Sequence, residues 1–181
     1  MKQLALWLSL AVLSAVPAHG TVIVTLLPAA TSVAVGDGVQ LDVVAQFGAE
    51  DSVLAWGLDL LLDPALLAVS GTPALGPSWI AFATPDGDGL GGVALSGLTG
   101  SHLLASLTLV GLAPGIVQLG LAVTPRDRTE GFALDPSGFA SGVVFQGATL
   151  EVLPEPAAPA LLALAAALAG GLRLWQRARL R

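Results

Sequence analysis

Residues 39–47 read Val39-Gln40-Leu41-Asp42-Val43-Val44-Ala45-Gln46-Phe47. Apolar side chains occupy every second position, and three polar side chains stand between them. Because successive side chains of a strand point to opposite faces, a period of two predicts a strand with one buried face. We expect Val39, Leu41, Val43, Ala45 and Phe47 to face inward and Gln40, Asp42 and Gln46 to face outward.

Apolar segments of similar length lie on both sides of this stretch, separated by turn residues such as Gly36-Asp37-Gly38 and Ala113-Pro114-Gly115. Many short strands with frequent turns, and no sustained helical period, predict an all-β fold, an antiparallel β-sandwich. In 54–62 we expect Leu54, Trp56, Leu58, Leu60 and Leu62 to face inward, and we expect a bulge in 142–152. The other expected strands are 22–26, 32–35, 68–70, 79–83, 93–95, 103–110 and 116–123.

Charge is distributed unevenly along the 181 residues. Residues 21–153 contain twelve acidic residues and only Arg126 and Arg128 as basic ones, a net charge of −10. A nucleic-acid-binding function is excluded on this ground, because two arginines among twelve acidic residues do not neutralise a phosphate backbone. The chain has no cysteine, so no disulfide framework is expected.

The N-terminus predicts a signal peptide over residues 1–20. Lys2 precedes an apolar run that ends at Pro17, and small residues follow. Cleavage after Ala18 or after Gly20 fits this pattern. An uncleaved N-terminal anchor is the alternative, and the middle of the chain, residues 21–153, is exported in either case.

The C-terminus, residues 154–181, has three parts. Pro154-Glu155-Pro156 comes first, and an uncharged apolar segment follows that spans roughly 25 Å as a helix. With its flanking residues, this segment is long enough for a transmembrane helix. A basic cluster at the end predicts that it lies in the cytoplasm. This cluster consists of Arg173, Arg177, Arg179 and Arg181.

This arrangement resembles the PEP-CTERM sorting signal of bacterial exosortase substrates, over residues 153–181. The two prolines keep the peptide extended and accessible at the inner membrane. The resemblance implies that an exosortase-type enzyme cleaves near the motif, and that the protein then reaches the cell surface or an exopolysaccharide matrix. A permanent single-pass membrane anchor is the alternative.

Two segments resemble the opening of a cohesin domain. Ser32-Val33-Ala34-Val35-Gly36-Asp37-Gly38-Val39-Gln40-Leu41-Asp42-Val43-Val44 has its strand, Gly-Asp turn and second strand. Trp56-Gly57-Leu58-Asp59-Leu60-Leu61-Leu62-Asp63-Pro64-Ala65-Leu66-Leu67 resembles the strand after it. The resemblance covers residues 21–153 and implies a jelly-roll-like sandwich that binds partners and performs no chemistry. Carbohydrate-binding modules have sandwiches of the same kind. Cohesins of cellulosomes bind dockerins, but these segments identify no contact surface for one.

No catalytic residues are predicted. Ser101 and His102 are adjacent on an expected strand, so they point to opposite faces and do not form a nucleophile–base pair. Asp59 and Asp63 lie near one strand end, and nothing places them across a sugar-sized cleft. A small secreted hydrolase therefore ranks last among the functional hypotheses.

The sequence offers two candidate binding features. Asp86 and Asp88 alternate with glycines, as in the first positions of a calcium loop, although a glycine hairpin turn is the alternative. Trp79 is a candidate for stacking against a sugar. The charged run Arg126-Asp127-Arg128-Thr129-Glu130 is interpreted as a solvated loop. The sequence therefore predicts an exported, non-enzymatic surface protein that binds a protein or a carbohydrate, with no cofactor unless Asp86 and Asp88 bind calcium.

Overall fold

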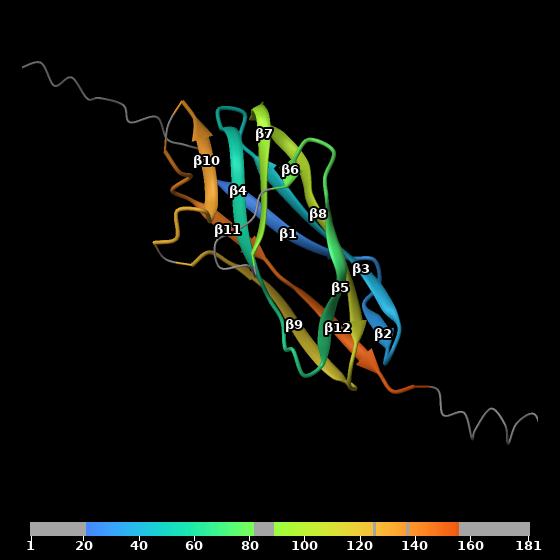
Figure 1. Cartoon of the computed structure of the whole chain (residues 1–181). Coiled ribbons are helices and arrows are strands. Elements are labelled where there is room, and N and C mark those ends of the chain that lie inside the picture. The colour runs from blue at the N-terminus through green and yellow to red at the C-terminus, as the bar shows by residue number, and fades with distance from the viewer. Residues whose placement is uncertain (1–20, 82–88, 125, 137, 156–181) are drawn as a thin grey trace, which may run out of the picture.

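The computed structural model describes residues 21–81, 89–124, 126–136 and 138–155. Every regular element in these ranges is a strand, and the strands form two packed layers (Figure 1). Among the described residues there is no helix long and apolar enough to span a membrane. The expected signal helix and the expected transmembrane helix lie outside the described residues.

The smaller sheet has the strand order β11-β1-β3-β8-β5. Its centre is antiparallel, and β11 is added to its edge in parallel with β1. Its strands are β1 (Val22–Pro28), β3 (Gly38–Phe47), β5 (Leu67–Leu75), β8 (Gly100–Gly111) and β11 (Val143–Gln146).

The larger sheet has the order β2-β12-β9-β4-β7-β6, and β10 pairs with the first part of β4. β2 joins β12 in parallel, whereas the other pairs are antiparallel. The expected antiparallel pairing therefore holds except at two edges, where β11 and β2 join in parallel. The strands are β2 (Ser32–Ala34), β4 (Ser52–Leu61), β6 (Ile80–Ala81), β7 (Leu90–Leu98), β9 (Gly115–Ala122), β10 (Gly131–Asp135) and β12 (Ala148–Leu153).

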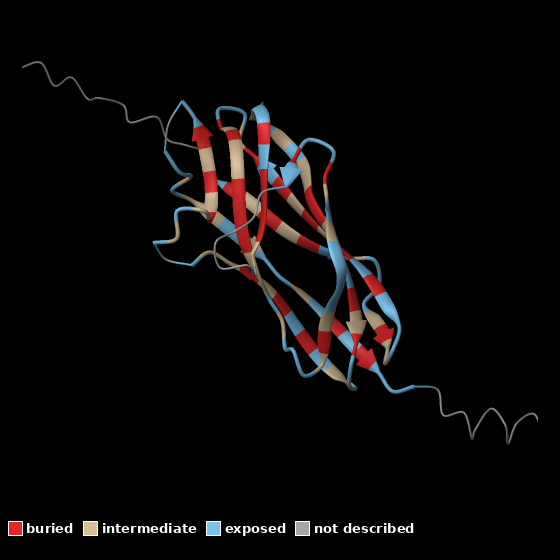
Figure 2. Ribbon diagram, viewed as in Figure 1, coloured by how far each residue is buried: buried red, intermediate tan, exposed pale blue. Residues whose placement is uncertain are grey.

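The core lies between the two sheets, and buried positions alternate with exposed or half-buried ones along most strands (Figure 2). The five inward residues predicted for 39–47 are all buried in β3, so this prediction is confirmed. In β9 the same alternation buries Val117, Leu119 and Leu121, whereas Val123 after the strand is half-buried. Alternation identifies these faces correctly because each strand covers the core with one side only.

In β4 the predicted inward set is wrong at its start. Val53 is buried and Leu54 is only half-buried, whereas Trp56 and Leu58 face the core as expected. The pairing of β4 with β7 and with β10 shifts register between Val53 and Ala55. A bulge therefore adds one residue and reverses the side-chain direction before Ala55.

The expected single strand 142–152 is two strands in different sheets. β11 pairs with β1, and after Gly147 β12 pairs with β9. A Cβ on Gly147 would lie 2.4 Å from the carbonyl oxygen of Leu119. The chain thus changes sheet at a point where the backbones approach too closely for any residue but glycine.

Candidate functional site

The outer face of the larger sheet is unusually apolar. Leu95 in β7 is 91% exposed and Ile80 in β6 is 55% exposed. Ile80 pairs directly with Val93, which is also exposed, so the three side chains lie together over β6 and β7. Exposed aliphatic side chains in one group are typical of a surface that another molecule covers. Further exposed apolar residues on this face are Leu61, Ile116, Phe139 and Leu153.

The outer face of the smaller sheet is mixed, because the exposed Leu27 and Val144 lie on it beside polar side chains. The Ser106 hydroxyl donates to Asp42 Oδ1 at 2.6 Å, and the Thr25 hydroxyl donates to Gln146 Oε1 at 2.9 Å. Polar side chains on this face therefore bond one another across neighbouring strands. The larger sheet carries the more exposed aliphatic group, with Leu95 and Ile80, and is therefore the candidate face for a macromolecular partner.

A charged loop crosses the outer face of the larger sheet. We define the arginine loop as Thr124 and residues 126–131. Its backbone rests on Gly57 of β4, where a Cβ would lie 2.0 Å from the carbonyl oxygen of Thr129. Gly57 points outward because its neighbours Trp56 and Leu58 face the core. A glycine in the middle of this strand therefore places the arginine loop against the sheet.

Hydrogen bonds within the arginine loop hold its shape. The Thr124 N–H donates to Glu130 Oε2, and the Thr124 hydroxyl donates to Asp59 Oδ2 at 2.9 Å. Asp127 Oδ1 accepts from the N–H and the hydroxyl of Thr129, at 2.7 and 2.6 Å. The Thr129 hydroxyl, followed by its N–H, lowers the pKa of Asp127 below its usual value, because both bonds favour the ionised carboxylate.

The burial of Glu130 differs from the sequence interpretation of residues 126–130 as a solvated loop. Glu130 is only 4% exposed, whereas a solvated loop was expected throughout. Its carboxylate links the two ends of the arginine loop through Thr124. The loop is thus partly built into the protein rather than fully solvated.

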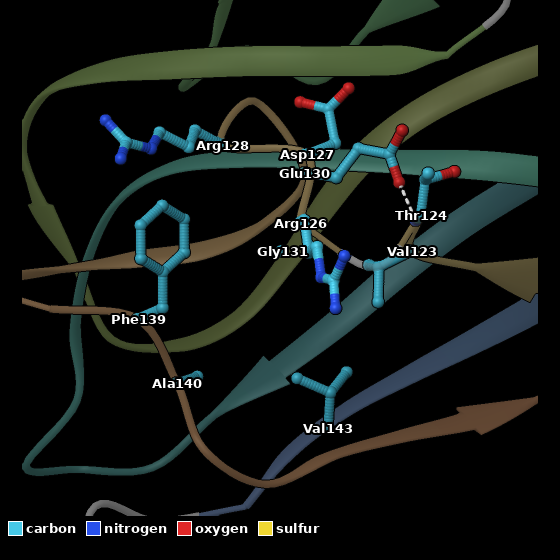
Figure 3. A pocket seen from close by; sticks show the side chains of 10 residues that line it. All are labelled: Val123, Thr124, Arg126, Asp127, Arg128, Glu130, Gly131, Phe139, Ala140 and Val143. Carbon is cyan, nitrogen blue, oxygen red and sulfur yellow. Dashed lines mark hydrogen bonds between the residues drawn. The ribbon is translucent and has the colours of Figure 1, made fainter.

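An open pocket of about 530 Å³ lies beside the arginine loop. Arg126 projects into it, Arg128 extends on the side of Phe139, and the Asp127 carboxylate points away from Val143 (Figure 3). Both arginines are exposed. The residues that line this pocket are Val123, Thr124, Arg126, Asp127, Arg128, Glu130, Gly131, Phe139, Ala140 and Val143.

Trp79, the predicted stacking residue, lies in the core instead. It is 7% exposed, and its indole N–H donates to the carbonyl oxygen of Leu103 at 3.0 Å. Its ring contacts Trp56 and Phe47 edge-on, with centroid distances of 6.1 and 6.3 Å. This burial leaves no open ring face for a sugar, because the core covers the indole.

His102, Asp59 and Asp63 were weighed as catalytic residues from the sequence, and each contacts neighbouring residues of the fold. His102 Nε2 lies 2.9 Å from the Thr99 carbonyl oxygen, and its ring stacks on Phe47 at 5.8 Å. Asp63 Oδ1 accepts from the N–H of Ala65 at 2.9 Å, as in a turn. Asp59 bonds to Thr124, as described above. These contacts explain each residue by local folding.

Two other predicted sites lie wholly or partly outside the described residues. Asp86 and Asp88 are not described, so calcium binding there stays a prediction. Among the described residues no group of three or more His, Cys, Asp or Glu side chains is placed to hold a metal ion. Pro154 and Glu155 follow β12 and are exposed. Pro156 and the four C-terminal arginines are not described.

No family model matches the chain, and no curated protein matches it in sequence. Solved cohesin modules match it in structure over nearly their whole length. The cohesin module of a Clostridium perfringens family 33 glycoside hydrolase superposes with a TM-score of 0.58 at 10% identity, covering 75% of this chain and 100% of the module. The fold is that of a cohesin module.

Two further matches support this likeness. A type II cohesin domain from the Acetivibrio cellulolyticus cellulosome has a TM-score of 0.53 and 15% identity, over 72% of this chain and 95% of its own. A Clostridium thermocellum cohesin, solved in a type I cohesin–dockerin complex, has a TM-score of 0.52 and 11% identity, over 75% and 97%. The expectation of a cohesin-like sandwich is therefore confirmed for the fold.

Sequence reasoning missed β10 and the pocket beside it. The alternation Phe132-Ala133-Leu134, with the first and last buried, was a signal for a strand. No sequence signal indicated that Phe139 and the arginine loop share a pocket in this cohesin-like fold. That proximity depends on the pairing of β10 with β4.

Proposed function

We propose that the chain is an exported, non-catalytic protein that binds another protein through the outer face of the larger sheet. The observation that carries this proposal is the exposed apolar group Ile80, Val93 and Leu95. Aliphatic side chains match the apolar core of a protein interface. A sugar-binding sheet needs exposed aromatic rings, and this group contains none.

The likeness to cohesins supports a protein partner. One of the similar structures is a cohesin bound to a dockerin, so this fold accommodates a protein ligand in that case. The net charge of −10 over residues 21–153 favours a partner with a basic surface, because opposite charges raise the rate of association. Dockerin itself is not proposed, since the likeness extends to the fold alone.

The binding face is tested by site-specific photo-crosslinking in the native cells. With a photoreactive amino acid at Leu95, we expect a discrete adduct with one protein, identified by mass spectrometry. The matched control is Thr108, which is exposed on the smaller sheet and is expected to give no adduct. With the photoreactive amino acid at the exposed Val93 instead, we expect the same adduct. Adding Leu95→Asp to that variant is expected to remove the adduct, because the aspartate places a negative charge in the apolar group. Equal adducts at Leu95 and Thr108, or none at either position, would refute this face.

We further propose that the C-terminal tail sorts the protein to the cell surface. The support is sequence-based: Pro154-Glu155-Pro156, the apolar segment and the terminal arginines resemble an exosortase substrate. Pro154 and Glu155 are exposed immediately after β12, where a membrane-embedded enzyme has access to the chain. The partners are then an exosortase-type enzyme and, before processing, the inner membrane.

The mass of the mature protein tests this sorting. We expect a chain that begins at His19 or Thr21 and ends near Pro154–Pro156, because both terminal segments are removed. The double variant Pro154→Ala/Pro156→Ala is expected to retain Arg181, because the extended motif is lost. A wild-type mature chain that still carries Arg181 favours the permanently anchored alternative.

A further inference from the structure

The pocket beside the arginine loop has the composition of an anion-binding site. Arg126 and Arg128 are the only lysine or arginine side chains in residues 21–155, and both line this one pocket. The rest of the domain is strongly acidic, so the positive charge of residues 21–155 is confined to this pocket. An arginine guanidinium matches a carboxylate with two parallel hydrogen bonds.

The acidic residues of the pocket are directed to the protein itself. Asp127 accepts two bonds from Thr129, and Glu130 is buried and accepts from Thr124. Figure 3 shows the carboxylate of Asp127 on the side away from Val143, whereas the Arg126 side chain projects toward Val143. The cations are therefore presented to a ligand, and these two carboxylates hold the loop that presents them.

Arg126 has a backbone conformation that supports a role in binding. Its φ is 77°, in the left-handed region that residues other than glycine rarely adopt. Such strained residues gather at ligand sites, where the surrounding structure holds them in place. Here the hydrogen bonds of the arginine loop on both sides of Arg126 supply that support.

Phe139 supplies the apolar part of the pocket. It is 52% exposed, and it bridges to Ala133 at the side of β10. Gly131 lies beneath it, since a Cβ there would be 3.4 Å from Phe139 Cδ1. A second hollow of about 120 Å³ adjoins the first, and Phe139, Gly131 and Arg128 line both. The Phe139 ring therefore lines two adjoining hollows.

We infer that this pocket binds a carboxylate-bearing saccharide, a uronate unit of an acidic polysaccharide. The larger hollow has the size of a small-ligand site, which is about 300–1,000 Å³. Arg128, on the side of Phe139, recognises the carboxylate of the unit whose ring packs on Phe139. Arg126 extends to another side of the pocket, where it is placed for the carboxylate of a neighbouring unit, and the second hollow continues the groove. An isolated anion would need the arginines only, whereas the aromatic ring and the second hollow favour a saccharide chain.

The inference rests on the proposed export of the chain, which brings the pocket to extracellular polysaccharide. It is independent of the protein-binding group Ile80, Val93 and Leu95.

Calorimetric titration of the full chain in mild detergent with a short oligogalacturonate is the test. The same oligosaccharide with its carboxyl groups methyl-esterified is the matched ligand control, because it keeps the rings and loses the charge.

We expect oligogalacturonate to bind and its methyl ester to bind at least about tenfold more weakly, which is about 1.4 kcal/mol. Arg126→Ala and Arg128→Ala are each expected to weaken oligogalacturonate binding to a similar degree. Phe139→Ala is expected to weaken binding by loss of the ring contact. Leu95→Asp is expected to leave it unchanged, and this separates the pocket from the proposed protein interface. The thermal midpoint of every variant is measured to confirm that it folds.

Four results would overturn the inference. The first is equal binding of the oligosaccharide and its methyl ester, and the second is binding that both arginine variants retain. The third is tighter binding of a poly-glutamate peptide with the same dependence on Arg126, which assigns the pocket to acidic peptides instead. Failure of all probes to bind also refutes the saccharide, whereas the crosslink at Leu95 decides the protein interface separately.

Discussion

Gly57→Ala is expected to lower the free energy of unfolding by about 3 kcal/mol. Its Cβ would lie 2.0 Å from the Thr129 carbonyl oxygen and 3.1 Å from the Glu130 Cα. Both obstacles are backbone atoms, so no side-chain rotation relieves the overlap. The arginine loop has to lift off β4, or the strand has to move. Urea unfolding followed by tryptophan fluorescence measures the change, with Trp56 and Trp79 as core reporters.

Gly120→Ala is the matched control for this change. Gly120 lies in β9 of the same sheet, but its nearest neighbour to an added Cβ is the Leu61 side chain at 3.7 Å. This is an ordinary contact, so we expect a change within about 0.5 kcal/mol. The Gly57→Ala variant should also lose oligogalacturonate binding, because Arg126 and Arg128 move with the loop. Equal stability of the two variants would show that Thr129 does not rest on Gly57.

Phe132→Ala is expected to cost about 4 kcal/mol of unfolding free energy. Phe132 is fully buried, pairs with Trp56 across β10 and β4, and packs edge-on against Phe47 at 5.8 Å. Truncation removes this buried area and leaves a cavity that the two sheets fill poorly. It also releases β10, the strand that follows the arginine loop.

Phe139→Ala is the control, because it removes the same side chain from a half-exposed position. We expect a change within about 0.5 kcal/mol for this variant. Thermal and urea unfolding of the two variants, measured side by side, give the comparison. A Phe132→Ala variant as stable as Phe139→Ala would contradict the placement of β10 against the core.

The strands with regular alternation were predictable from the sequence, and the irregular ones were not. Residues 39–47 form a strand with the expected inward face because each residue continues a local period of two. The bulge at Leu54 reverses that period within β4, and its cause is the register with β7 and β10. The register between strands that are distant in sequence cannot be predicted from the local alternation of side chains.

The candidate site follows the same division. Arg126 and Arg128 were visible as a charged run, but Glu130 was expected in solvent and is buried. Trp79 was a candidate for stacking against a sugar and packs in the core. It directly precedes β6, and a strand of two residues is too short to show from alternation which side faces inward. Phe139 drew no prediction, since a single aromatic residue in a turn-rich segment has no period.

By itself the sequence determined the fold class, the acidic character of the domain and the tail that resembles a sorting signal. These properties follow from alternation, charge and the order of segments, all of which are local. Only the tertiary structure decided that Gly57 supports the arginine loop, that Gly147 carries the chain from one sheet to the other, and that Phe139 stands beside the two arginines. Each of these is a close approach between backbones or side chains distant in sequence, and such approaches exist only once the strands have paired.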